Sequence, residues 1–115
     1  MQAILITKDL LLGSQIAGSA KAAGCELTEV ASADQLRAAL ANTQATHIVI
    51  DLTCTGIRDE LATLVPKLKS ADSPPTVIAY GPHVQEGALA AATSAGCDRV
   101  LTRGQLSREL NTLFA

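Results

Sequence analysis

The stretch Thr46-His47-Ile48-Val49-Ile50-Asp51 predicts a buried β-strand that ends in a carboxylate. His47 to Ile50 are four consecutive residues that suit a strand and show no polar alternation, which favours a strand covered on both faces. We therefore expect it to be a central strand of a parallel sheet. Asp51 then lies at the carboxyl end of that strand, where open α/β sheets place their binding crevices.

Four further segments read as strands, and segments with helical patterns separate them. The other predicted strands cover residues 3–6, 25–30, 76–80 and 98–102. Helices are predicted from Leu10 to Ala23, after a capping-box pattern at Ser32 and Gln35, around Leu61 to Leu68, from His83 to Ala95, and from Gly104 onward. Pro66 lies inside the third helical pattern and is expected to kink or shorten that helix.

Five strands that alternate with five helices, joined by right-handed crossovers, give a doubly wound parallel α/β sheet. With the strands numbered along the chain, we expect the flavodoxin-like order 2-1-3-4-5 in a single domain, residues 1–115. The strand at 25–30 alternates in polarity and is predicted near an edge. In this order Cys25 and Cys97 begin strands on opposite edges, so they cannot form a disulfide with each other.

Composition excludes several classes of partner. Hydrophobic residues make up 48% of the 115 residues, enough for a core without disulfides or metal. An aromatic share of 2%, a net charge of -2 and the lack of a Lys/Arg cluster argue against nucleic acid and anionic membranes. No signal-peptide pattern and no apolar run near the roughly 18 residues of a membrane span are found, so we expect a cytoplasmic protein.

Polar residues follow the strands where their carboxyl ends should meet. We expect one shallow crevice lined by Thr7, Lys8, Asp9, Asp51, Thr53, Tyr80, Thr102 and Arg103. His47 and His83 have no second ligand at suitable spacing, so no metal site is expected from them. Cys54 has no adjacent His to form a nucleophilic dyad, and we expect no enzymatic activity. The loop after the first strand is not glycine-rich, which disfavours dinucleotide or flavin binding.

Four segments resemble the receiver domain of two-component response regulators: residues 3–9, 47–52, 75–81 and 95–103. The resemblance covers nearly the whole chain and implies that Asp51 stands at the family's phosphoacceptor position. The family's two acidic metal ligands fall on Thr7 and Lys8. Its small hydroxyl residue falls on Tyr80, and its lysine falls on Arg103. Only the phosphoacceptor position therefore keeps the family's residue, and it stays open whether Asp9 is one of the acidic ligands displaced by one or two places.

These departures imply a degenerate receiver. Mg²⁺ needs oxygen ligands, and phosphoryl transfer needs cations that neutralise the transferred group. We expect the ammonium of Lys8 to occupy the metal's position beside Asp51 and, with Arg103, to hold the carboxylate ionised in one state. Tyr80 is too large to reproduce the movement of the family's small hydroxyl.

The leading hypothesis is a signalling module that binds a protein partner, such as a kinase, an output domain or a second copy, with no cofactor and no phosphorylation. Two surfaces are candidates for this contact. One is Leu10-Leu11-Leu12, since three adjacent leucines cannot all face inward from one helix. The other comprises the fourth helix, the fifth strand and the final helix. Two alternatives remain open: a receiver that accepts phosphate on Asp51 with Mg²⁺, and a small-molecule binder in the same crevice.

Overall fold

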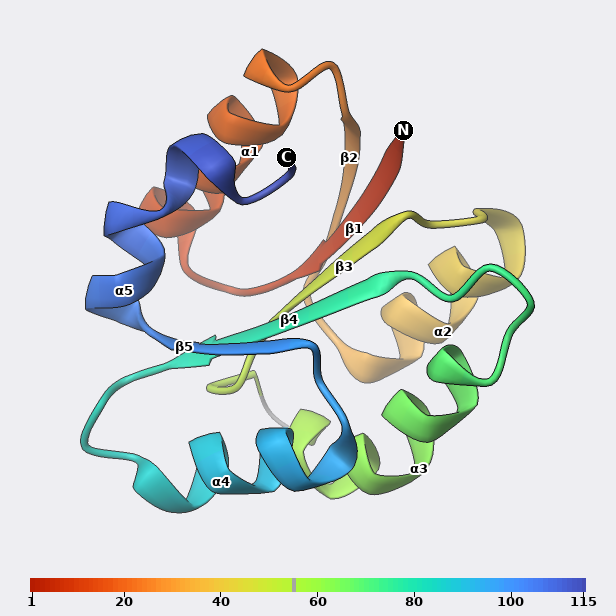
Figure 1. Cartoon of the computed structure of the whole chain (residues 1–115), viewed down its shortest axis with the longest axis vertical. Helices are drawn as coiled ribbons and strands as arrows, with labels where there is room; N and C mark the ends of the chain where they lie inside the picture. Colours follow the sequence, from red (N-terminus) through yellow and green to blue (C-terminus); the bar gives the residue numbers. More distant parts are fainter. Residues whose placement is uncertain (55) are drawn as a thin grey trace.

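The computed structural model describes residues 1–54 and 56–115, in which five β-strands alternate with five α-helices (Figure 1). The elements in chain order are β1 (Gln2–Ile6), α1 (Leu10–Ala22), β2 (Glu26–Val30), α2 (Ala33–Asn42), β3 (His47–Asp51), α3 (Ile57–Lys69), β4 (Thr76–Gly81), α4 (Glu86–Ala95), β5 (Arg99–Thr102), α5 (Arg103–Arg108) and the 3₁₀ helix η1 (Leu110–Thr112).

All strand pairs are parallel, and their order is β2-β1-β3-β4-β5, which confirms the predicted doubly wound topology. β3 lies at the centre, and all five of its residues are buried. Its register places Ile50 beside Ile6 of β1 and Asp51 beside Tyr80 of β4. The carboxyl ends of β1, β3 and β4 therefore meet at one edge of the sheet.

Two hydrophobic clusters cover the two faces of the sheet. Successive strand residues face opposite sides, so Ile48 and Ile50 of β3 join one cluster and Val49 joins the other. The first cluster includes side chains of α2, α3 and α4, and the second includes those of α1, α5 and the C-terminal residues, as the arrangement in Figure 1 shows. Each buried aliphatic side chain contributes about 1.5–3 kcal/mol, so both layers are needed to hold the sheet.

The edge strand β2 is the polar strand of the sheet. Glu26, Thr28 and Glu29 are exposed, whereas Leu27 and Val30 are partly buried. This confirms the edge position predicted from its alternating sequence. Charged side chains on an edge strand discourage pairing with another chain.

The described part of the chain has neither a disulfide bond nor a helix suited to cross a membrane. Cys25 precedes β2 and Cys97 precedes β5, on opposite edges of the sheet, and both are free thiols, as is Cys54. Among the helices in residues 1–54 and 56–115, none has the length and apolar character needed to cross a membrane.

Two helix boundaries differ from the sequence prediction. α4 begins at Glu86 instead of His83, because Pro82 and the next residues form a turn in which the Gln85 amide donates to the Pro82 carbonyl at 3.0 Å. α5 begins at Arg103, one residue earlier than predicted, with Thr102 as its N-cap.

The final helix is also broken, where the sequence predicted a continuous one. It ends at Arg108 and gives way to η1 after Glu109. The Ser19 hydroxyl of α1 donates to the Leu110 carbonyl, so that oxygen is used by a tertiary contact. The break allows Leu113 and Phe114 to be buried against the α1 side of the sheet.

Pro66 does not stop α3, which continues three residues further, to Lys69. Proline lacks the amide that would bond to the Ala62 carbonyl. Both residues are exposed, so water can hydrate that carbonyl. The Ser70 amide still bonds to the Pro66 carbonyl at 3.1 Å, which continues the helical pattern. The prediction that Pro66 shortens the helix was therefore wrong, whereas the alternative, a kink, stays a prediction.

Candidate functional site

Asp51 is the last residue of β3, and its side chain is buried under the polar loops of the carboxyl edge, with 1% of the residue exposed. Both carboxylate oxygens accept hydrogen bonds. Thr7 donates from Oγ1 to Oδ2 at 2.6 Å. Thr53 donates to Oδ1 twice, from its amide at 2.9 Å and from its hydroxyl at 2.6 Å. The buried carboxylate is thus held by neutral donors, as a buried polar group requires.

The positions of these two threonines follow from the sheet. Thr7 comes directly after β1, which pairs with β3 in register, so it lies next to the end of β3. Thr53 lies two residues beyond Asp51, where a short loop lets an Asp side chain bond to the chain two residues on. The Cys54 amide also bonds to the Asp51 carbonyl at 3.1 Å, which fixes the start of that loop.

Lys8 does not occupy the position beside Asp51 that the sequence analysis assigned to it. Its side chain is exposed, and within residues 1–54 and 56–115 it forms no ion pair. The neighbouring Thr7 hydroxyl contacts the carboxylate in its place. The expectation of a lysine in the metal's position was therefore wrong, and a threonine holds Asp51.

Asp9 and Arg103 form a separate contact between α1 and α5. The Asp9 carboxylate caps α1 by accepting from the Leu12 amide at 3.0 Å. Its other oxygen lies 3.8 Å from the Arg103 guanidinium, a partly exposed ion pair of small stabilising effect. The Asp9 amide donates to the Thr7 hydroxyl at 3.0 Å. Arg103 therefore pairs with Asp9, and not with Asp51 as expected.

Tyr80, which the sequence resemblance placed at the position of a mobile hydroxyl, has a fully buried ring. It belongs to the cluster beneath α1 and α5, with no exposed surface. Its hydroxyl has no hydrogen-bond partner among the residues described. Burial raises the pKa of Tyr80 well above its ordinary value, and the negative charge of Asp51 raises it further. The Tyr80 ring is part of the core, and its hydroxyl keeps its proton.

Thr102 serves the fold of α5. Its hydroxyl accepts from the Gln105 amide at 3.1 Å, and the Gln105 side chain accepts from the Thr102 amide at 2.9 Å. This reciprocal pair is a capping box. The spacing Thr-x-x-Gln was visible in the sequence and was missed.

The expected single crevice is therefore divided. Thr7, Lys8 and Asp9 line a small hollow of about 390 Å³ between α1 and the start of α2, and Asp51 does not line it. Asp51, Thr7 and Thr53 form a hydrogen-bonded cluster in which only Asp51 is buried, whereas Thr102 caps α5 and Arg103 pairs with Asp9.

The donor set around Asp51 does not fit Mg²⁺, which prefers several carboxylate or carbonyl oxygens. In the described part of the chain no three His, Cys, Asp or Glu side chains converge on a common point. The carboxylate of Asp9 already caps α1 and pairs with Arg103. Asp51 is left as a lone carboxylate whose oxygens already have donors.

Cys54, in the loop after Asp51, is also unsuited to chemistry. Its thiol is buried, with 4% of the residue exposed. Burial raises the pKa of Cys54, and the charge of Asp51 raises it further, so the reactive thiolate is disfavoured.

The first turn of α1, beside this cluster, carries exposed apolar side chains. Leu10 is 89% exposed and Leu11 is 73% exposed, whereas Leu12 is buried. Large apolar side chains that are exposed side by side commonly mark a contact surface.

Neither a scan of protein-family models nor a search of curated proteins found a significant match to this sequence. Solved structures of response-regulator receiver domains, in contrast, have the same fold. The receiver domain of the TMAO respiratory response regulator TorR aligns with a TM-score of 0.80 at 15% identity, covering 95% of this chain and 88% of that one.

Two other structures show that the fold accompanies different modes of regulation. An atypical orphan response regulator with a phosphorylation-independent regulatory mechanism aligns at TM-score 0.75 and 14% identity, covering 98% of this chain and 92% of that one. The phosphorylated cyanobacterial phytochrome response regulator RcpA aligns at TM-score 0.76 and 15% identity, covering 96% and 88%. The chain thus has the receiver fold, as its sequence resemblance implied.

Proposed function

We propose that this chain is a receiver-type signalling module that acts through contact with a protein partner and has no enzymatic step of its own. In this proposal Asp51 does not undergo Mg²⁺-dependent phosphorylation. The observation that carries the proposal is the burial of Asp51 under three hydrogen bonds from Thr7 and Thr53, without a second carboxylate for a metal.

Phosphoryl transfer to a carboxylate requires cations that neutralise the charge of the transferred group. Thr7 and Lys8 stand where the resemblance to receivers would place two acidic ligands. To accept phosphate, Asp51 would also have to give up hydrogen bonds of 2.6 Å from both threonine hydroxyls. A carboxylate held by these hydrogen bonds supports a module whose protein partner recognises a single conformation.

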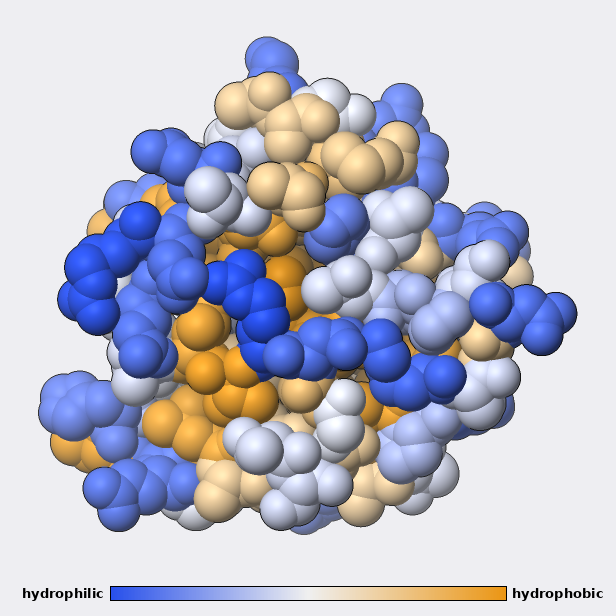
Figure 2. All heavy atoms as spheres, viewed as in Figure 1, coloured by the Kyte–Doolittle hydropathy of each residue, from blue (hydrophilic) through white to orange (hydrophobic). Residues whose placement is uncertain are grey.

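Two surfaces support contact with a partner such as a signalling kinase, an output domain or a second copy of the chain. The first is the exposed pair Leu10 and Leu11 at the start of α1. The second is the face of α4, β5 and α5. There, Figure 2 shows apolar side chains between β5 and α4, where Leu89 and Val100 are only partly buried.

The test is treatment with acetyl phosphate or beryllofluoride, each with Mg²⁺, followed by intact-mass measurement and amide NMR. We expect no Mg²⁺-dependent mass gain and no shift of the Asp51 and Thr53 amide signals. A mass gain that is abolished by Asp51→Asn would overturn the proposal and establish the phosphoaccepting alternative, in which the threonine hydroxyls turn away.

The double variant Thr7→Asp/Lys8→Asp provides a matched positive control, because it restores acidic residues at the two family positions. Carboxylates crowded beside Asp51 repel one another until a cation binds. If the variant binds Mg²⁺ with a dissociation constant of about 1 mM, 10 mM Mg²⁺ stabilises it by about 1.4 kcal/mol. The unmodified chain should show no such shift in thermal unfolding.

A further inference from the structure

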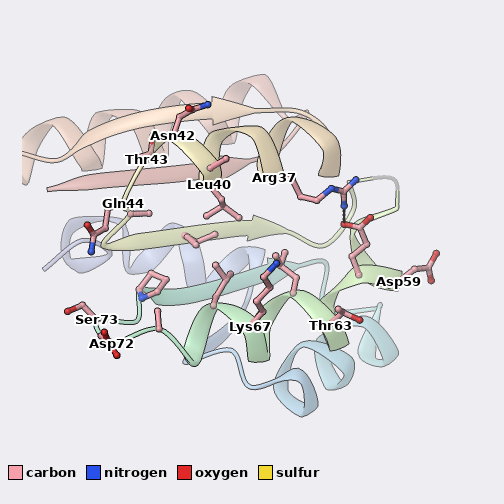
Figure 3. A pocket seen from close by; sticks show the side chains of 18 residues that line it. Arg37, Leu40, Asn42, Thr43, Gln44, Asp59, Thr63, Lys67, Asp72 and Ser73 are labelled. Carbon is pink, nitrogen blue, oxygen red and sulfur yellow. Dashed lines mark hydrogen bonds and ion pairs between the residues drawn. The ribbon is translucent and has the colours of Figure 1, made fainter.

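A groove of about 1140 Å³ lies between α2 and α3, on the face of the sheet opposite α1 and α5 (Figure 3). The segments before β3 and β4, residues 42–45 and 71–75, enclose its other end. These segments precede the strands, whereas Asp51 ends β3. The groove is therefore at the opposite edge of the sheet from the Asp51 cluster.

The inner surface of the groove is apolar. Leu40 of α2 projects from one wall, Leu64 and Leu68 of α3 from the other, and Ala45 lies before β3. All four are only partly buried although they pack against the main core cluster. Their exposed apolar surface would be removed from water by an apolar ligand in the groove.

Most charges around the groove are already compensated or directed away. Arg37 forms ion pairs with Glu60, at 2.5 Å across the groove, and with Asp34. A dashed line at Arg37 in Figure 3 marks the ion pair with Glu60 at one end of the groove, and Asp59 points away from the groove. Asp72 lies in the loop at the other end.

Lys67 is the exception. It comes from α3, and Figure 3 shows its side chain rising between the two helices toward the apolar wall. Within the described residues its ammonium has no ion-pair partner. Lys69, in the same turn, is instead bound to Asp98 at 2.7 Å and to the Pro75 carbonyl at 2.8 Å. The groove thus combines an apolar surface with one lysine that points into it, whereas Asp59 and Asp72, which also form no ion pair among the described residues, lie at its ends.

We propose that this groove binds a single-chain amphiphile with one anionic head, its hydrocarbon tail against Leu40, Leu64 and Leu68 and its carboxylate beside Lys67. The tail buries apolar surface, and the head supplies the opposite charge that Lys67 lacks. A cationic amphiphile of the same length would place like charges together. This site is independent of Asp51 and of the proposed signalling role.

The test uses dodecanoate below its micelle concentration, with dodecylammonium as the ligand of reversed charge. Binding is followed by amide NMR on the full chain. We expect saturable shifts at Leu40, Ala45, Leu64 and Leu68 with dodecanoate and clearly weaker binding of dodecylammonium.

Matched lysine variants isolate the charge. Lys67→Ala should weaken dodecanoate binding by roughly five-fold, as expected for loss of one ion pair, and Lys67→Glu by more than about ten-fold. Lys21→Ala is the control, because Lys21 is also an exposed lysine in the last turn of a helix, α1, away from the groove. It should change binding by less than about two-fold.

Three outcomes would overturn the proposal. One is the absence of saturable shifts at the groove. Another is equal binding by the chain and Lys67→Glu, or equal binding of the two amphiphiles. The third is a response confined to Leu10 and Leu11, which would assign the binding to the exposed leucines of α1.

Discussion

Thr7 donates a hydrogen bond of 2.6 Å from Oγ1 to Oδ2 of Asp51, and this contact joins the carboxyl ends of β1 and β3. This donation uses the single proton of the hydroxyl, whose oxygen also accepts a hydrogen bond from the Asp9 amide at 3.0 Å. Four tests follow from this arrangement, from the buried side chains of Tyr80 and His47, and from the exposed side chains of Leu10 and Leu11.

Replacing Thr7 by Val should lower the free energy of unfolding by about 1–3 kcal/mol, because a buried carboxylate oxygen loses its donor. Urea unfolding measures this change, provided that the slope of the transition stays constant. Thr7→Ser keeps the hydroxyl and should lose less than half as much. If the two variants are equally stable, the hydrogen bond is not what stabilises this part of the fold.

Replacing Tyr80 by Phe removes a buried hydroxyl that has no partner among the described residues. At neutral pH we expect no loss of stability, and a gain of up to about 1 kcal/mol. Burial raises the pKa of Tyr80, so above its ordinary value of 10.0 the unfolded chain releases a proton that the folded chain keeps. The free energy of unfolding should therefore fall as the pH rises above 10.0.

That alkaline loss should be smaller in Tyr80→Phe. Tyr80 is the only tyrosine, so the ultraviolet absorbance of tyrosinate reports its ionisation directly. Ionisation of the folded chain near pH 10.0 would contradict the assignment of Tyr80 as a buried neutral side chain.

His47 should make the fold sensitive to mild acid. Its ring is buried, with 8% of the residue exposed, and its edge contacts Phe114 with ring centres 5.5 Å apart. Burial lowers the pKa of His47 below its ordinary 6.5, and the charge of the N-terminus lowers it further. As the pH falls through 6.5, the unfolded chain binds a proton before the folded chain does, so stability should decrease.

The measurement is urea unfolding between pH 7 and 5 for the chain, His47→Gln and His83→Gln. His83 is the only other histidine and is exposed, which makes it the matched control. The acid-dependent loss should disappear in His47→Gln alone. An undiminished loss in His47→Gln would assign the effect to carboxylates.

Replacing Leu10 and Leu11 together by Ser should leave stability within about 0.5 kcal/mol, because both are exposed surface positions. The same variant should lose contact with a partner that docks on α1, measured by comparative affinity capture and by sedimentation for self-association. Leu12→Ser is the contrasting variant: Leu12 is buried, and we expect a loss of about 2–5 kcal/mol. Unchanged capture by the double variant would remove this surface from the proposal.

The sheet could be predicted from the sequence because its strands are short apolar runs with clear boundaries. The run from His47 to Ile50 predicts a buried strand. The alternation of the remaining strands and helices then leaves few possible topologies, because crossovers between parallel strands are right-handed. Helical geometry also predicted that Leu10, Leu11 and Leu12 cannot all face inward, since adjacent residues face different directions, and the structure shows that Leu12 is the buried one.

The contacts of the site could not be predicted equally well. Thr7 and Lys8 follow a strand end, where the alternation of side chains no longer fixes direction, so family positions suggested the wrong neighbour for Asp51. Asp9 before an apolar helix was a readable capping signal, as was Thr102 with Gln105, and both were assigned to the crevice instead. The start of α4 lacks such a signal, because Gln85 makes no side-chain cap.

The bond from the Asp9 amide to Thr7 links the beginning of α1 to the buried carboxylate in two steps. Leu10 and Leu11 follow Asp9 directly. A protein that binds these leucines and displaces the start of α1 must therefore also weaken or break the hydrogen bond from Thr7 to Asp51. The two effects are thermodynamically reciprocal. Binding of the protein changes the equilibrium between the formed and broken Thr7–Asp51 contact by some factor, and a change at Asp51 that breaks the contact changes the affinity for the protein by that same factor.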